Sequence, residues 1–349
     1  MSTSADPSHT QGMPPARVLL RLISGTYVAQ AIYAVAKLGI ADLLRDGSQG
    51  SDVLAQATGT DTRALYRVLR TLASVGVLVE DAAVRFGLTP LGACLQTGVP
   101  GSLRAYAILA GEENFRAWAE VLSSVRTGKS AFEQVFGMGV YDYRAHHPEA
   151  AAVFNEAMTE WTQQTAPAVV AAYDFAACTR VVDVGGGQGH LLIALLQAYP
   201  HLQGVLVELP YVATAAQARL EAAGLAHRCE VVAGDFFDAM PGGGDVYILK
   251  NVIDSFEDDR TVRLLQHCHR AMAPQGKLLV VGQVIRPGND PAISKLLDLQ
   301  LLVGVGGPVR TEAELHRLFA AAGFQLTHII PTQAATEDSI IEGVRSEAV

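Results

Sequence analysis

A run of glycines in the second half of the chain follows directly on a short apolar segment. The segment reads VVDVGGGQGHLLIALL, in which Asp183 precedes Gly185, Gly186, Gly187 and Gly189. Glycines let the backbone approach a ligand closely, and a strand that turns through them into a helix is typical of nucleotide-containing ligands. Taken alone, the segment fits a nicotinamide or flavin dinucleotide as well as S-adenosylmethionine.

Side chains that could bind a ligand also lie at the ends of the apolar runs that follow. Glu208 lies about twenty residues beyond Gly189, where a carboxylate accepts hydrogen bonds from ribose hydroxyls. Asp235 and Phe236, in GDFF, suit an adenine edge and an adenine face, and Lys250 ends the next run. These residues predict a site for an adenosine-containing ligand.

The glycine spacing distinguishes between the candidate ligands. A dinucleotide site expects G-x-G-x-x-G, whereas GGGQG has no glycine at the final spacing, so a pyrophosphate would lose its usual cradle. Asp183 would repel a diphosphate but suits an amino acid that carries a sulfonium. We therefore predict S-adenosylmethionine as the cofactor, with Asp183, Gly185 and Gly187 among its contacts.

The elements that must position these residues form an alternating pattern after Cys178. Short apolar runs alternate with helical segments, and the runs are RVVDVGGG, QGVLVELP, EVVAGDFF, DVYILKNVI and GKLLVVGQVI. This alternation is typical of a doubly wound parallel sheet. We expect an α/β, Rossmann-like catalytic domain over residues 176–349.

The first third of the chain has a different, mainly helical pattern. After a polar tail expected to be disordered over residues 1–15, apolar residues recur at helical spacing, with an interruption at Gly25 and an end at Gly39. This face belongs either to a core helix or, as we favour, to a subunit interface. Two further helices and a short strand then follow, which predicts a winged-helix domain over residues 16–100.

The middle segment, residues 101–175, is helical in pattern and rich in aromatic residues. Most of these side chains suit a core, but some could roof a pocket for a flat substrate, because aromatic walls are common in small-molecule sites. Our candidate substrate contacts in this segment are Phe154, Met158 and Trp161.

Length and composition limit the possible partners. A chain of 349 residues suggests two domains, and its 26 basic against 35 acidic residues give a net charge of −9. Nucleic-acid binding needs clustered basic charge, so we expect a small-molecule ligand and no nucleic acid. Charged residues interrupt the apolar runs before the roughly 18 residues of a membrane span, so we expect no membrane insertion.

The four cysteines lie far apart and form no C-x-x-C pair. This arrangement indicates neither a zinc site nor a disulfide framework, so we expect no metal and a reducing, cytoplasmic location. The first residues lack the apolar core of a signal peptide.

Several segments together resemble the caffeate and hydroxyneurosporene-type O-methyltransferases. The resemblance runs from Ala16 to the end of the chain, and its segments are LGIADLL, ALYRVLRTLASVGV, VVDVGGGQGH, VELP, GDFF, YILKNVI and GGPVRTEAELHRLFAAAGF. It implies a class I methyltransferase domain, a homodimer swapped through a winged-helix dimerisation domain, and an acceptor pocket between the two domains. The residues that it implies for the cofactor are Gly185, Glu208, Asp235, Phe236 and Lys250, with Thr162 at the methionine carboxylate.

The sequence departs from this family at the position of its catalytic base. Members that methylate hydroxyls carry a His in a segment like LKxxxHDW, because a phenol with a pKa near 10 needs a base. Here the segment is LKNVIDSF, with Asp254 in that position, and the two supporting Glu positions hold Gln283 and Val309. We treat Asp254 and Gln283 as the candidate catalytic residues.

The loss of all three groups leaves several mechanisms open. Methyl transfer to a ring nitrogen, an amine, a carboxylate or an enol-like carbon needs little base assistance, and we favour this class. In a second class the sulfonium serves only as a fixed charge for a pericyclic, decarboxylating or hydroxylating reaction. In a third possibility, Asp254 is the base, and burial has raised its pKa. The alternative without a catalytic role is that Asp254 is a helix N-cap.

Two further candidates flank the predicted acceptor region. Asp298 and Arg310 either pair with substrate charges or pair with each other. A regulator that senses the cofactor through a winged helix, without catalysis, is the alternative from another class. The weak basic charge of the predicted winged helix disfavours this regulator hypothesis.

Overall fold

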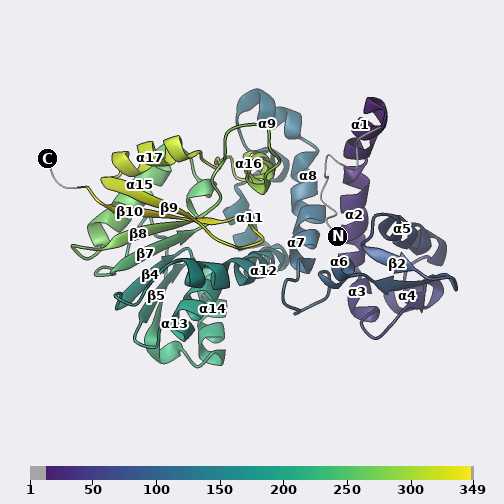
Figure 1. Ribbon diagram of the computed structural model, residues 1–349, viewed down its shortest axis with the longest axis horizontal. Coiled ribbons are helices and arrows are strands. Elements are labelled where there is room, and N and C mark those ends of the chain that lie inside the picture. Colours follow the sequence, from purple (N-terminus) through teal and green to yellow (C-terminus); the bar gives the residue numbers. More distant parts are fainter. Residues whose placement is uncertain (1–12, 347–349) are drawn as a thin grey trace. The chain divides into compact units, whose positions relative to one another are not determined.

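The computed structural model describes residues 13–346 (Figure 1), and the chain divides into two compact units, Met1–Glu112 and Glu113–Val349. Most of the predicted tail, residues 1–15, lies outside the described residues, and the first helix begins at Pro15. The domain limits expected at residues 100 and 175 stay predictions.

The N-terminal unit is helical with a small three-stranded sheet. The sheet has the order β1-β3-β2, with antiparallel pairs throughout. The elements of this unit are α1 (Pro15–Ile23), α2 (Gly25–Lys37), α3 (Ile40–Leu43), β1 (Gln49–Gly50), α4 (Ser51–Thr58), α5 (Thr62–Ser74), β2 (Leu78–Glu80), β3 (Arg85–Leu88), α6 (Pro90–Ala93) and α7 (Arg104–Leu109).

The predicted helix, helix and wing are present in that order as α4, α5 and the β2–β3 hairpin. Helix α5 begins where the Asp61 side chain accepts a hydrogen bond from the Ala64 N–H at 2.7 Å, an N-cap. It buries Leu65, Leu69 and Leu72 on one face. The expected winged-helix fold is confirmed.

Helices α1 and α2 expose an apolar surface. None of the α1 residues is buried, and Leu20 and Leu22 are 62% and 65% exposed. By length and composition the stretch Pro15–Lys37 would suffice to cross a membrane, which corrects the expectation that charges interrupt every apolar run in time. Apolar core helices and N-terminal signal sequences pass the same test, so it is weak evidence of a span.

The C-terminal unit contains a seven-stranded sheet with the order β6-β5-β4-β7-β8-β10-β9. The first five strands in this order are parallel, and β10 is antiparallel to both neighbours. The strands are β4 (Arg180–Val184), β5 (Gln203–Glu208), β6 (Cys229–Ala233), β7 (Val246–Lys250), β8 (Lys277–Gly282), β9 (Phe324–Pro331) and β10 (Ser339–Arg345). The five predicted parallel strands are confirmed, whereas the sequence analysis missed β9 and β10.

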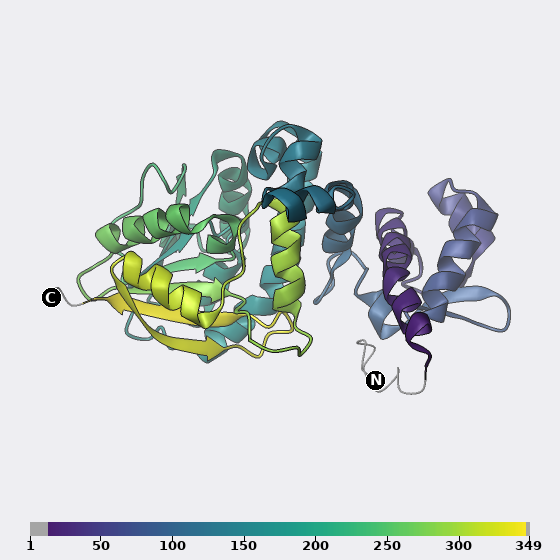
Figure 2. The same ribbon diagram turned by 90° about the horizontal axis from the view of Figure 1, so that it is seen from above.

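Helices cover both faces of this sheet (Figures 1 and 2). One apolar core packs α15 and α17 against the sheet, and the other packs α12, α13 and α14 against its opposite face. The helices of the unit are α8 (Phe115–Trp118), α9 (Val121–Thr127), α10 (Ala131–Phe136), α11 (Val140–His146), α12 (Pro148–Ala172), α13 (His190–Ala198), α14 (Pro210–Ala222), α15 (Asp258–Ala271), α16 (Ile293–Gly304) and α17 (Glu312–Ala321), with one-turn helices η3 (Ala226–Arg228) and η4 (Ile253–Ser255) and a π-turn η2 (Ala110–Asn114) at the unit boundary.

The predicted helical middle segment packs against a helix that lies much later in the chain. The Trp118 indole N–H donates to the Gln300 side-chain oxygen at 2.6 Å, and the Ser130 hydroxyl donates to the Val303 carbonyl at 3.2 Å. Phe132 and Val303 share a small apolar core with their neighbours. Helices α8 to α10 therefore depend on α16 for their packing.

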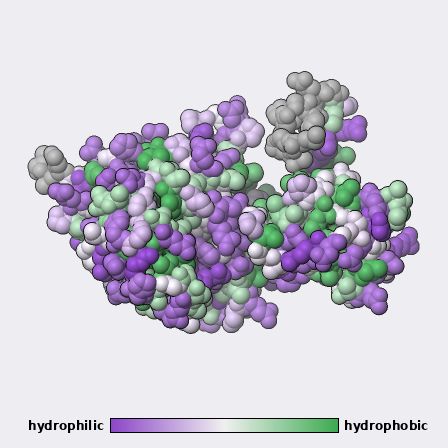
Figure 3. Space-filling view, turned by 60° about the horizontal axis from the view of Figure 1, so that its bottom comes forward, coloured by the Kyte–Doolittle hydropathy of each residue, from purple (hydrophilic) through white to green (hydrophobic). Residues whose placement is uncertain are grey.

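On the face shown in Figure 3, hydrophilic side chains separate the hydrophobic ones into small patches. The exposed apolar side chains of α1 differ from most of that surface, because four of them lie within five residues of one helix: Leu19, Leu20, Leu22 and Ile23. Apolar clusters of this kind mark contact surfaces in proteins.

We expect Leu20→Glu with Leu22→Glu to abolish self-association through α1. Burying a leucine contributes about 1.5–3 kcal/mol, so two charges at the contact should weaken association at least about a hundredfold. Light scattering at micromolar protein should change from dimer to monomer. Val53→Glu, at an exposed apolar position on α4, is the control. A monomeric wild-type protein would contradict the prediction.

Candidate active site

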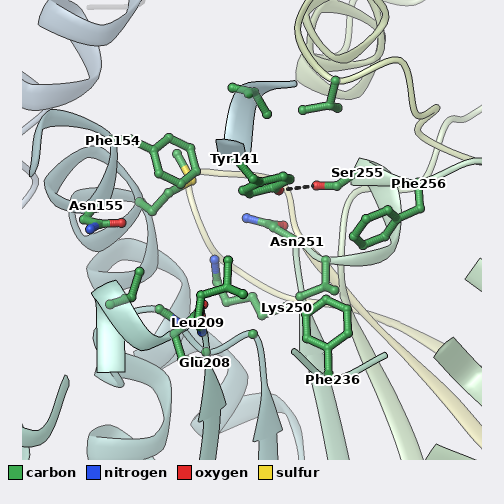
Figure 4. A pocket seen from close by; sticks show the side chains of 18 of the residues that line it. Tyr141, Phe154, Asn155, Glu208, Leu209, Phe236, Lys250, Asn251, Ser255 and Phe256 are labelled. Atoms are coloured by element: carbon green, nitrogen blue, oxygen red, sulfur yellow. Dashed lines mark hydrogen bonds between the residues drawn. The ribbon is translucent and has the colours of Figure 1, made fainter. Parts of the chain in front are cut away.

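A cavity of about 520 Å³ lies at the carboxyl ends of the parallel strands in the C-terminal unit (Figure 4). Its volume is in the range of small-molecule sites. The strand ends supply its floor, and helices α11 and α12 supply much of its wall. The lining residues that the sequence analysis had selected are Phe154, Met158, Thr162, Asp183, Gly185, Gly187, Glu208, Asp235, Phe236 and Lys250.

The glycine-rich turn after β4 is shaped by its neighbours. Gly185 has a φ of +67° and Gly187 a φ of +59°, which glycine adopts without steric strain. A Cβ at Gly186 would lie 2.3 Å from an Asp183 carboxylate oxygen and 2.4 Å from Leu206 Cδ1. The turn therefore needs glycine at this point, and its backbone stays open to a ligand.

Glu208 is fixed by the backbone of the same turn. The Gly187 N–H donates to one carboxylate oxygen at 2.9 Å, and the Leu209 N–H donates to the other at 2.8 Å. Burial raises the pKa of Glu208, and these two hydrogen bonds oppose that change. Each carboxylate oxygen keeps a lone pair for a second donor, such as a ribose hydroxyl.

Asp183 is fully buried, and neither of its carboxylate oxygens has a hydrogen-bond partner in the described structure. Burial raises its pKa to about 7, and the positive charge of Lys250 opposes that change. A buried carboxylate without donors is costly unless a ligand compensates it. The site therefore fits a ligand that brings a positive charge or an ammonium donor, as S-adenosylmethionine does.

The end of the cavity beyond β6 is aromatic. Asp235 accepts a hydrogen bond from the Phe237 N–H at 2.8 Å, which turns the chain after the strand. Phe236 lies edge to face with Phe256, and the Arg260 guanidinium lies 4.9 Å from the centre of the Phe256 ring. These rings make this end of the cavity apolar, which suits an adenine.

The opposite end of the cavity holds neutral polar groups that the sequence analysis did not select. The Tyr141 and Ser255 hydroxyls are 2.8 Å apart, and Asn251 lies between this pair and Lys250 (Figure 4). Phe154 lines the same region, and Phe256 lies next to Ser255 on the side of the cavity that Phe236 also lines (Figure 4). Asn251 and Ser255 lie close to the candidate base Asp254 in the sequence, and this proximity could have identified them as candidates.

Thr162 lines the cavity, but its hydroxyl hydrogen already has an acceptor. The hydroxyl donates to the Met158 carbonyl at 2.7 Å, one helical turn back. To hold a methionine carboxylate, which only accepts, this hydroxyl would have to turn away from that carbonyl. The assignment of Thr162 stays a prediction.

The two candidate catalytic residues lie behind the cavity wall. Neither Asp254 nor Gln283 is among the described lining residues, although Asn251, Val252 and Ser255 are. Asp254 is buried, and burial raises its pKa to about 7 against the opposing charge of Arg310. Asp254 is no N-cap, because it lies in η4 and α15 begins only at Asp258, which corrects that alternative.

Gln283 is held by a structural hydrogen bond. Its side-chain N–H₂ donates to the Thr336 carbonyl at 2.7 Å, while its side-chain oxygen is buried without a partner in the described structure. Its catalytic role therefore has no geometric support at the cavity.

The candidate substrate contacts Asp298, Arg310 and Trp161 also lie outside the described lining. Asp298 accepts from the Val309 N–H at 2.9 Å, whereas Arg310 donates to the Asp258 carboxylate at 3.0 Å. The Arg310 guanidinium donates to the carbonyls of Ile253 at 3.1 Å and Phe256 at 2.8 Å. It thus holds the loop that presents Ser255 and Phe256 to the cavity.

The comparisons with known proteins agree with this geometry. A family model described as an O-methyltransferase domain matches residues 118–325, and one described as an O-methyltransferase dimerisation domain matches residues 20–98. The phenazine O-methyltransferase PhzM of Lysobacter antibioticus is 47% identical over 330 residues, which cover 95% of this chain and 96% of that protein.

Two further comparisons extend the match. The 8-amino-8-demethylriboflavin N,N-dimethyltransferase of Streptomyces davaonensis is 40% identical over 309 residues, which cover 87% of this chain and 88% of that protein. The crystal structure of LaPhzM has a TM-score of 0.92 at 47% identity and covers 95% of this chain and 100% of its own. The resemblance found in the sequence is confirmed: the chain belongs to the O-methyltransferase family and is an S-adenosylmethionine-dependent methyltransferase.

Proposed function

We propose that this protein transfers a methyl group from S-adenosylmethionine to a heteroatom of a small, planar aromatic metabolite of the natural-product type. The observation that carries the proposal is one cavity that Asp183 lines, with Glu208 at one end and Tyr141, Ser255 and Phe154 at the other (Figure 4). A cofactor site and an acceptor site that share one cavity suit direct transfer between two bound molecules.

Within this proposal, each residue of the cofactor end has a separate task. Glu208 accepts hydrogen bonds from the ribose, Asp183 faces the positive charge, and Phe236 packs on the adenine. The bound cofactor supplies an electrophilic methyl group on a positively charged sulfur. The protein contributes position and the exclusion of water, which can supply a large part of the rate.

The relatives support a planar, nitrogen-containing acceptor. One acts on a phenazine and another on a riboflavin derivative, and both of these ring systems are fused and flat. The Phe154 and Phe256 side chains would contact the faces or edges of such rings.

Asp254 and Gln283, at the positions of the family base and one of its supports, are not among the described residues that line the cavity. This arrangement supports an acceptor that is nucleophilic without strong base assistance. Asp254 lies behind the wall, and Tyr141 has a pKa raised by burial, so its hydroxyl stays protonated. Ring nitrogens, amines and acidic heteroaromatic hydroxyls meet this requirement.

We also propose that the protein acts as a homodimer. The exposed apolar face of α1 and the match of residues 20–98 to a dimerisation domain support this assembly. That the N-terminal domain helps to close the acceptor site, as the family resemblance implies, stays a prediction.

The proposed function can be tested by locating the transferred methyl group in the product. The protein is incubated with 1-hydroxyphenazine and S-adenosylmethionine labelled in its methyl group, and mass spectrometry locates the label on oxygen or on ring nitrogen. Label in the product supports the proposal. Consumption of the acceptor without transfer of label would indicate instead that the cofactor acts only as a fixed charge.

We expect Glu208→Ala to weaken binding of S-adenosylhomocysteine by about 1–3 kcal/mol, because a partly buried hydrogen-bond acceptor is lost. Isothermal titration calorimetry measures the effect. Glu221→Ala removes an exposed carboxylate from α14, the helix after β5, and should leave the affinity unchanged. Equal affinities of Glu208→Ala and wild type would reject the assignment.

We expect Asp254→Asn to retain methyl transfer to within roughly tenfold, equivalent to about 1.4 kcal/mol of barrier. A general base would contribute on the order of a hundredfold or more. With a pKa near 7, a base at Asp254 would give wild type an acidic limb of activity centred near pH 7. Turnover across pH decides the case, because a large loss together with disappearance of that limb would make Asp254 the base.

A further inference from the structure

Asn251 has a backbone conformation that L-amino acids rarely adopt. Its φ is +53°, and the only other non-glycine residues with positive φ in the described chain are Val84 and Glu337. It follows β7 directly, and its N–H donates to the Val281 carbonyl at 2.9 Å. Strained backbone of this kind often accompanies function, and here it turns a carboxamide into the cavity wall.

The two ends of that carboxamide face different surroundings. Its oxygen lies 3.5 Å from the point that a Cβ at Gly282 would occupy, and an Asp254 carboxylate oxygen lies 3.4 Å from the same point. The amide nitrogen turns toward the side on which Phe154 lies (Figure 4). No hydrogen bond to the Asn251 side chain is present within the described residues, so its N–H groups can donate to a ligand.

The Tyr141–Ser255 pair offers a second donor beside it. The pair contains two hydroxyl hydrogens, and the contact at 2.8 Å uses one of them. The other hydrogen has no acceptor among the described protein atoms and is available to a ligand. Burial is the largest cause that raises the pKa of Tyr141, so the pair stays neutral and acts as a donor.

We infer that the Asn251 carboxamide and the Tyr141–Ser255 pair form a two-donor oxyanion site, which receives a hydroxylated planar heterocycle as its conjugate base. The inference rests on the proposed function and specifies its acceptor. The acceptor hydroxyl gives its proton to solvent on binding. Its oxygen then forms the new bond to the methyl group, while the carbon–sulfur bond breaks and its electron pair remains on sulfur.

This assignment explains how the site works without the family base. Donors that point at a negative oxygen in a cavity shielded from water stabilise it far more than they would in water. The site thereby shifts the ionisation of the acceptor itself, instead of removing its proton with a side chain. A hydroxyl conjugated with a ring nitrogen is acidic enough for this shift to matter near neutral pH.

Other charges in the cavity act on the same oxygen. Lys250 and Arg260 favour the anion, His190 is neutral because burial lowers its pKa to about 4, and the carboxylates oppose the anion. The lining carboxylates are Glu133, Asp142, Asp183, Glu208 and Asp235, and Asp254 lies behind the wall. None of these groups changes in the variants below, so their effect is constant.

The test uses the visible spectrum of 1-hydroxyphenazine, which differs between its neutral and ionised forms. In the wild-type complex with S-adenosylhomocysteine, the apparent pKa of the bound probe should fall by about one unit or more, a tenfold shift in its ionisation. Asn251→Gly keeps the positive φ but removes the donor, so it should lose most of this shift. Val84→Gly relieves a similar φ of +59° far from the cavity in sequence and should keep it.

Turnover gives an independent readout. Asn251→Gly should reduce kcat/KM by about tenfold or more at pH 6, and the deficit should shrink at a pH at which the free probe is already ionised. Asn251→Asp places a carboxylate at the oxyanion and should lose more at every pH. A purely structural role for Asn251 would move neither the spectrum nor the pH dependence.

The outcomes separate the inference from the proposed function. Failure of wild type to bind S-adenosylhomocysteine in calorimetry would contradict the proposed function. Binding of S-adenosylhomocysteine without binding of the probe would overturn the hydroxylated heterocycle as acceptor. An equal spectral shift in wild type and Asn251→Gly, with the cofactor product bound to both, would overturn the role of Asn251.

Discussion

The parallel register of β4 and β5 is the constraint on which the site depends. Val184 pairs with Val207, so the chain leaves both strands at the same level. The Gly185 N–H then donates to the Val207 carbonyl at 2.8 Å, and the Gly187 N–H donates to Glu208 at 2.9 Å. A shift of this register by one residue would separate the glycine turn from its carboxylate and turn Asp183 to the other face of the sheet.

Electrostatics divide the cavity into two regions. Ionisable groups surround the cofactor end, where Asp183 is buried without donors and Lys250 is its main opposing charge. The region that we propose for the acceptor presents Asn251 and the Tyr141–Ser255 pair, which are neutral. Arg310 lies outside the cavity lining but supports this second region, because it donates hydrogen bonds to carbonyls of the loop that carries Ser255. Under the proposed mechanism, the replacement of the family base and its supports goes together with hydrogen-bond donation to the acceptor in place of proton removal.

Sequence reasoning selected several residues that line the cavity at the strand ends, because strand ends and glycines have a local signature. Glu208 and Lys250 could be placed from the apolar runs that precede them, and the cavity contains both. The acceptor end was less predictable, since Tyr141 and Ser255 meet only after residues 114 positions apart are folded together. Arg310 was misjudged for a related reason: its charge suggested a substrate contact, but it pairs with Asp258 and donates to backbone carbonyls, contacts that no sequence pattern reveals.

The dependence of α8–α10 on α16 has a consequence for synthesis of the chain. A ribosome completes residues 115–136 long before it reaches Gln300 and Val303, the partners of Trp118 and Ser130. Until then Phe132 and its aromatic neighbours lack one wall of their core. The nascent chain therefore carries an uncovered apolar segment until α16 has been made, a state in which aggregation competes with folding and chaperones are most useful.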